Sequence, residues 1–212
     1  MAVNFENPNL PKVNIVPRLS RLLKTNYAIQ YSTLLSLILL FIELIYSQIT
    51  NSLLLFTVAL VQLSLTAFLL FTVFIRNGEN IKSRLVNTLL NCLVLVLLTG
   101  IIFFECYERY TTPIDIHSNA ALLVALFAFM GNLLIIRMLW RTNFLKLKFG
   151  SFRLPLQGIG ILSITVLLGT ALITLTDYYL LDVLFSLLVG ISIFIRAGFM
   201  MIDAYWHIHE MA

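Results

Sequence analysis

Residues 43–65, ELIYSQITNSLLLFTVALVQLSL, decide the fold class, because a short polar turn, ITNS, lies between two apolar runs. The apolar runs are continuous and lack the alternating polarity of strands in a membrane β-barrel. A helix needs about 20 apolar residues to cross roughly 30 Å of hydrocarbon, and both runs extend far enough to do so. The stretch therefore predicts two membrane-spanning helices joined by a tight connection.

The whole chain has the same character. Of its 212 residues, 60% are hydrophobic and only 11% are charged, and the mean hydropathy is +0.96. Soluble domains carry roughly 25% charged residues, so we expect an all-α integral membrane protein. Six transmembrane helices are predicted, at about residues 29–48, 52–75, 85–104, 116–140, 154–176 and 179–202. They define a six-helix domain at 28–204, between a basic cytoplasmic segment at 1–27 and a short cytoplasmic tail at 205–212.

Several function classes do not fit this sequence. The basic residues that give the chain its net charge of +4 lie beside the apolar spans, where they orient helices, so nucleic acid is not an expected partner. Cys92 and Cys106 form no CxxC pair. The first residues lack the apolar core and cleavage site of a signal peptide, and we expect the first span to act as the insertion signal. We expect neither an enzyme nor a bound cofactor, and membrane lipid is the expected surrounding.

The distribution of basic residues predicts the topology. Twelve of the fourteen Lys and Arg residues precede the first span, separate spans two and three, or lie at and beyond the inner end of span four. Arg109 lies on the opposite side, and Arg196 lies within span six. By the positive-inside rule both termini face the cytoplasm. The outer connections are short, so sequential helices are expected to be antiparallel neighbours.

Five polar side chains inside the spans are candidate functional residues. Glu43 is the acidic one. It either serves a function, or it needs none because it is protonated or snorkels to the outer interface. Asn91 and Asn132 lie at similar depth on consecutive spans and are expected to hydrogen-bond to each other, while Gln62 either packs or lines a wet cavity. Arg196 is expected to snorkel to cytoplasmic head groups and not to pair with Glu43.

The spacing of polar residues across spans three and four is specific. An Asn stands fourteen residues before a Glu, followed by an Arg four later, a loop Pro, and an Asn deep in the next span: Asn91, Glu105, Arg109, Pro113 and Asn132. Elsewhere a Glu stands nine residues before a Ser-Leu pair, and a Ser stands nineteen residues before an Asp with a second Ser four later: Glu43, Ser52, Leu53, Ser163, Asp182 and Ser186. In these spacings the chain resembles the transmembrane domain of the cation diffusion facilitator family, the exporters of zinc and other divalent cations.

The resemblance implies a six-helix bundle, usually a homodimer, that exchanges Zn²⁺ for protons by alternating access. It also implies a metal site midway across the bilayer, built by two side chains of span two and two of span five. Counted from Ser52 and from Asp182, those four positions are Val61, Leu65, Pro155 and Ile159. All four are apolar, and the neutral side chains nearby cannot compensate a dehydrated dication. We therefore expect this chain to lack the central metal site.

Two lesser sites complete the predictions. Asp182, at the start of span six, is expected to act as a helix cap. Asp203, His207 and His209 form a weak candidate for a cytoplasmic metal site, because Asp203 and His207 are four residues apart on a continuing helix.

Three functions remain open, in order of preference. The chain is a transport-related subunit that forms a dimer with a metal-competent relative, or it is a structural or regulatory membrane protein without transport. The last alternative is an autonomous carrier of another cation or of protons that uses Glu43.

Overall fold

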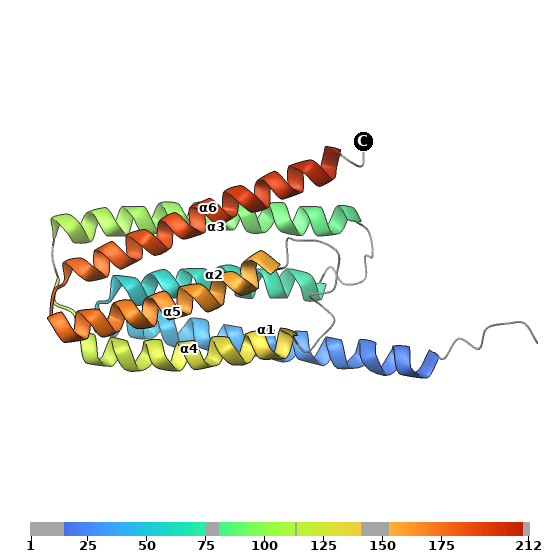
Figure 1. Cartoon of the computed structure of the whole chain (residues 1–212), viewed down its shortest axis with the longest axis horizontal. Helices are drawn as coiled ribbons and strands as arrows, with labels where there is room; N and C mark the ends of the chain where they lie inside the picture. Colours follow the sequence, from blue (N-terminus) through green and yellow to red (C-terminus); the bar gives the residue numbers. More distant parts are fainter. Residues whose placement is uncertain (1–14, 75–80, 113, 141–152, 210–212) are drawn as a thin grey trace, which may run out of the picture.

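The computed structural model is built only of α-helices in its described residues, which are 15–74, 81–112, 114–140 and 153–209 (Figure 1). The helices are α1 (Ile15–Thr50), α2 (Leu53–Phe74), α3 (Ile81–Thr111), α4 (Ser118–Trp140), α5 (Arg153–Thr176) and α6 (Leu180–His209). Each lies where a span was predicted, and α1, α3 and α6 extend well beyond the predicted apolar segments. The all-α prediction is thus confirmed.

Five helices are long and apolar enough to cross a membrane: Tyr27–Thr50, Leu53–Phe71, Thr88–Thr111, Ser118–Trp140 and Leu180–Trp206. Large apolar side chains such as Leu97, Phe104 and Leu175 lie on the outer surface, where lipid covers them. The chain is therefore an integral, multi-pass membrane protein. In α5 the apolar stretch found among the described residues, Gly160–Thr176, is shorter than a full span, so the sixth crossing stays a prediction.

The connections from α1 to α2, from α3 to α4 and from α5 to α6 lie at one end of the bundle, here called the turn end (Figure 1). The start of α1 and the end of α6 lie at the other, here called the termini end. Asn51 and Asp177 follow α1 and α5 with positive φ values of 54° and 51°. Both residue types tolerate this left-handed conformation, which commonly ends a helix.

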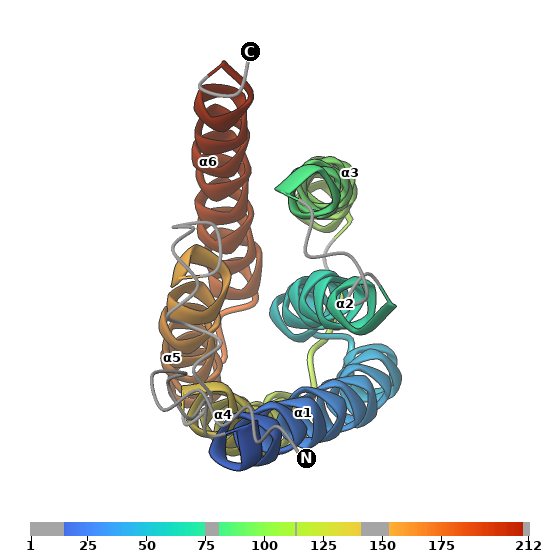
Figure 2. The same cartoon turned by 90° about the vertical axis from the view of Figure 1, so that its right-hand side faces the viewer.

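Helix α2 lies at the centre of the bundle and packs against α1, α3, α5 and α6. Helix α3 packs mainly against α6, whereas α4 packs against α1 and α5. The prediction that sequential helices are neighbours is therefore wrong for α3 and α4, which lie on different sides of α2 (Figure 2). A short connection fixes only the end of the bundle at which two helices are joined. Here α3 packs mainly against α6, and α4 packs against α1 and α5.

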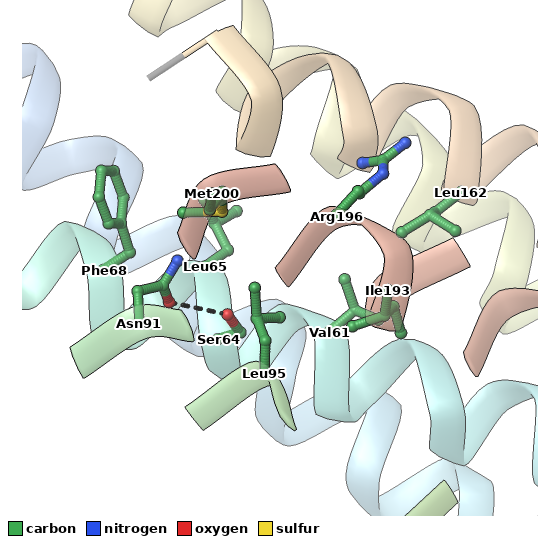
Figure 3. A pocket seen from close by; sticks show the side chains of 10 residues that line it. All are labelled: Val61, Ser64, Leu65, Phe68, Asn91, Leu95, Leu162, Ile193, Arg196 and Met200. Carbon is green, nitrogen blue, oxygen red and sulfur yellow. Dashed lines mark hydrogen bonds between the residues drawn. The ribbon is translucent and has the colours of Figure 1, made fainter. Parts of the chain in front are cut away.

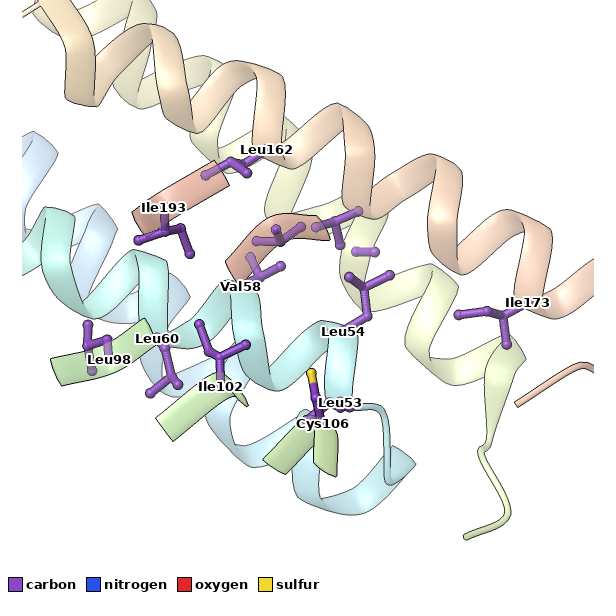
Figure 4. Close-up of a cluster of buried hydrophobic side chains, with 13 residues drawn as sticks. Leu53, Leu54, Val58, Leu60, Leu98, Ile102, Cys106, Leu162, Ile173 and Ile193 are labelled. Atoms are coloured by element: carbon purple, nitrogen blue, oxygen red, sulfur yellow. The ribbon is translucent and has the colours of Figure 1, made fainter. Parts of the chain in front are cut away.

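Two apolar clusters form the interior. The larger joins α2, α3, α5 and α6 through side chains such as Leu54, Ile102, Ile173 and Ile193 (Figure 4). The smaller joins α1, α2 and α4 and includes the fully buried Ile135. Within a bilayer the lipid is as apolar as these side chains, so close packing and hydrogen bonds hold the helices together.

Candidate functional site

At the turn end, Asp182 of α6 caps the start of α2. Its Oδ2 accepts a hydrogen bond from the backbone N–H of Leu53 at 2.6 Å, and its Oδ1 accepts from the N–H of Leu54 at 2.9 Å. The Ser52 hydroxyl donates to Oδ1 at 3.1 Å. A carboxylate suits this position because the first amides of a helix lack partners and carry partial positive charge. The predicted cap exists, but it serves α2 rather than the helix that carries it.

Arg109 of α3 closes the same end of the bundle. Its Nη1 donates to the backbone carbonyl of Asn51 at 2.7 Å, directly after the end of α1. The backbone N–H of His117 donates to the carbonyl of Thr50 at 3.0 Å. These contacts tie the start of α4 and the end of α3 to the α1–α2 turn.

The two asparagines bind hydroxyl groups and not each other. Ser64 of α2 donates to Oδ1 of Asn91 on α3 at 3.0 Å. Nδ2 of Asn132 on α4 donates to Oγ of Ser163 on α5 at 3.0 Å. The predicted bond between Asn91 and Asn132 is therefore wrong, because α3 and α4 do not pack together. Each amide instead pairs with a serine on the helix beside it.

Gln62 belongs to a small hydrogen-bonded cluster between α1 and α2. Its Nε2 donates to the Ser36 hydroxyl at 3.0 Å. Ser36 is also 2.7 Å from the Thr66 hydroxyl, which donates in turn to the carbonyl of Gln62. All three side chains are buried. The cluster satisfies its members from within the helix pair, as polar groups in a hydrocarbon interior require.

Glu43 is fully buried on α1, with an exposed fraction of 0%. Neither of its carboxylate oxygens has a hydrogen-bond partner in the part of the chain that the structure describes. The alternative that Glu43 snorkels to the interface is therefore wrong. The side chain turns into the bundle because it lies on the face of α1 that also carries Leu39, Leu40 and Ser47, all buried.

A cavity of about 40 Å³ lies between α2, α3, α5 and α6 (Figure 3). Val61 and Leu65, two of the positions at which the resemblance implies metal ligands, both line it. On α5, Leu162 lines the cavity, although it is not one of the four positions counted from Ser52 and Asp182. The other two counted positions, Pro155 and Ile159, belong to α5, but their side chains lie outside the described residues. Leu162 precedes Ser163, a residue that the resemblance did match, and that adjacency was the available signal.

Arg196 is the one charged residue among the described residues that line this cavity. It lies on α6 between Ile193 and Met200, which also line the cavity, and it is half-buried. Its stem thus packs inside the bundle, and that its guanidinium snorkels to head groups stays a prediction. Its helix position directs it to the bundle interior, because residues three before and four after it share the inward face.

A second, smaller cavity of about 10 Å³ adjoins the first. It is lined by the polar side chains of Gln62, Asn132 and Ser163, and it shares Val61 and Leu162 with the larger cavity. Such a volume suffices for about one water molecule. Oδ1 of Asn132 is buried and has no partner among the described residues, so it can accept a hydrogen bond from a water there.

The weak metal candidates at the end of α6 are not tested, because the side chains of Asp203, His207 and His209 lie outside the described residues. In the rest of the described chain, no three His, Cys, Asp or Glu side chains gather as a metal site requires. Comparison with protein-family models and with curated proteins finds no match for this chain. The chemistry of the central cavity therefore has to be inferred from its lining.

Proposed function

We propose that this chain is a transport-related membrane subunit, similar in plan to the cation diffusion facilitators, that does not hold the transported metal itself. It forms a dimer with a metal-competent relative and supplies half of the assembly. The observation that carries the proposal is the lining of the central cavity. Val61 and Leu65 line it where ligands are expected, and Arg196, a cation, is the one charged residue in the described part of its lining. A guanidinium repels a dication, and apolar walls give it no ligands.

A second observation supports the family resemblance behind this proposal. The polar residues on which the resemblance rests make contacts between helices far apart in sequence. Asp182 binds Ser52 at the start of α2, and Asn132 binds Ser163. Polar side chains that faced lipid would not make such contacts between helices. The resemblance thus involves contacts that hold the bundle together.

The experiment has two arms. The full chain, purified and reconstituted in vesicles, is expected to show no saturable Zn²⁺ uptake under a proton gradient. The chain isolated from its native membrane in mild detergent is expected to bring with it a metal transporter, and its depletion from cells is expected to reduce that transporter's flux. Zn²⁺ uptake by the purified chain contradicts the proposal. A flux unchanged by depletion favours instead a structural or regulatory membrane protein.

One observation favours the autonomous carrier as a second candidate. The carboxyl of Glu43 is buried in the bundle without a hydrogen-bond partner in the described chain, as expected for a group that takes up and releases a proton or cation. In the same vesicles, proton or monovalent-cation flux that disappears in Glu43→Gln would support this role. Equal flux in the parent protein and in Glu43→Gln removes it.

A further inference from the structure

Arg196 lies well inside the apolar span of α6. The span that contains it runs from Leu180 to Trp206, so Arg196 stands ten residues before its end, or about 15 Å at 1.5 Å per residue. Charged side chains at such depth are rare, face the interior or a wet cavity, and mark functional sites by default. Arg196 follows this pattern, because it lines the central cavity and is half-buried.

Among the described residues of the cavity lining, Arg196 has no counter-charge. The described residues that line the cavity include no Asp or Glu. Neither of the two buried carboxyls that the structure describes lines this cavity. Glu43 has no hydrogen-bond partner among the described residues, and Asp182 caps α2. An unpaired charge in a low-dielectric interior is strongly disfavoured. We therefore expect the guanidinium to attract an anion from outside the chain.

Arg196 and Asn91, two of the three described polar side chains that line the cavity, offer hydrogen-bond donors. A guanidinium carries five N–H donors and no acceptor. Asn91 uses its Oδ1 to accept from Ser64, which leaves its amide nitrogen as a further donor at the other side of the lining (Figure 3). The remaining walls, such as Leu95, Leu162 and Ile193, are apolar. Donors set in apolar walls suit a weakly hydrated monovalent anion. A multiply charged anion would lose more hydration free energy than hydrogen bonds from these donors could compensate.

We propose that Arg196 makes the central cavity a binding site for a small inorganic anion of halide size. The volume of about 40 Å³ has room for such an ion together with water. A phospholipid phosphate that enters from the bilayer offers the guanidinium similar chemistry, and the experiment must separate the two sources. The site stands whether or not the chain works beside a transporter.

The test measures binding of radioactive chloride to the full chain in a maltoside detergent, which carries no phosphate. We expect saturable binding of one chloride per chain and a higher thermal midpoint in chloride than in gluconate, by about 2 to 4 °C. In Arg196→Gln the affinity should fall roughly tenfold or more, while Arg196→Lys should keep part of it. Arg137→Gln is the matched control, because Arg137 is an exposed arginine on α4, and it should bind chloride like the parent.

Three results would overturn the proposal. The first is an absence of saturable chloride binding by the folded parent protein. The second is equal chloride affinity in Arg196→Gln and the parent. The third is a midpoint that responds to added phosphatidylglycerol but not to chloride, since this would assign the guanidinium to a lipid. If Arg196→Gln does not fold, two measurements still test the proposal. The parent must bind chloride, and Arg196→Lys must bind it with reduced affinity.

Discussion

Asn132 of α4 donates a hydrogen bond from Nδ2 to Oγ of Ser163 on α5 at 3.0 Å, while its own carboxamide oxygen faces no partner in the described chain. The bond holds α4 to α5 beside the smaller cavity, which both residues line. One half of the amide therefore serves packing, and the other half is available to a water molecule.

This pairing predicts an energetic coupling between Asn132 and Ser163. In a double-mutant cycle of Asn132→Leu and Ser163→Ala, the coupling energy should be about 0.6 kcal/mol, the average for hydrogen bonds between membrane helices. The cycle of Asn91→Leu and Ser64→Ala should give a similar value. Unfolding in mixed detergent micelles provides the free energies.

A third cycle, of Asn91→Leu and Asn132→Leu, is the control. These side chains lie on helices that do not pack together, so their effects should add. A coupling in this cycle as large as in the other two would contradict the helix arrangement.

The cap on α2 predicts a large effect of a minimal change at Asp182. Asp182→Asn keeps the shape of the side chain but turns one acceptor into a donor that faces a backbone N–H. We expect the free energy of unfolding to fall by about 1.5 to 3 kcal/mol. Asp177→Asn is the matched control, because Asp177 is exposed and Asn tolerates its positive φ. Equal stability of the two variants would show that the cap contributes little.

Close helix approach predicts which glycines tolerate alanine. A methyl group at Gly169 of α5 would lie 2.7 Å from Leu54 Cδ2 and 3.0 Å from Phe185 Cγ, both in neighbouring helices. We expect Gly169→Ala to lower the free energy of unfolding by about 1 to 3 kcal/mol. A methyl group at Gly100 of α3 meets no atom within 4 Å, so Gly100→Ala should be neutral or slightly stabilising. A Gly169→Ala variant as stable as Gly100→Ala would contradict the packing of α5 on α2.

The environment of Glu43 predicts tolerance of a neutral isostere. Since neither oxygen has a partner in the described chain, Glu43→Gln removes no hydrogen bond, and stability should stay within about 1 kcal/mol of the parent or rise. Glu43→Ala should lower it by about 2 kcal/mol or more, because it leaves a cavity. Severe destabilisation by Glu43→Gln would point to a partner in a larger assembly.

The central cavity predicts how metal binding can be introduced. Val61→Asp, Leu65→Asp and Leu162→His place three ligands on one cavity, with water available as the fourth. With Arg196 retained, the new carboxylates should pair with it and bind Zn²⁺ poorly. With Arg196→Met added, calorimetric titration should detect Zn²⁺ binding. Equal Zn²⁺ affinity with and without Arg196 would show that its charge does not govern the cavity.

Sequence patterns predicted the helices well because their signal is local. Continuous apolar runs and short polar turns such as Asn51–Ser52 depend only on residues within one helix length. The spacing from Ser52 also led to Val61 and Leu65, which do line one cavity, because a helix keeps its register over three turns.

Contacts between helices were harder to predict, because they depend on which helix packs beside which. Asn91 and Asn132 have similar depth and chemistry, yet their partners are serines on other helices. Depth alone did not show that Arg196 faces the interior, since the same position on another face of α6 would reach lipid. The expected metal positions on α5 were counted back from Asp182, over a longer distance in sequence than those on α2 from Ser52. Leu162 was not among them, although it lines the cavity.

The cap from Asp182 to Leu53 spans 129 residues of sequence, and it has a consequence for biosynthesis. The ribosome makes α2 early, but the carboxylate that satisfies its first amides is synthesised only with the last helix. Until then the beginning of α2 must rely on water or on the insertion machinery. Nascent chains that stop short of Asp182 should therefore be recognised by membrane quality control as unfinished.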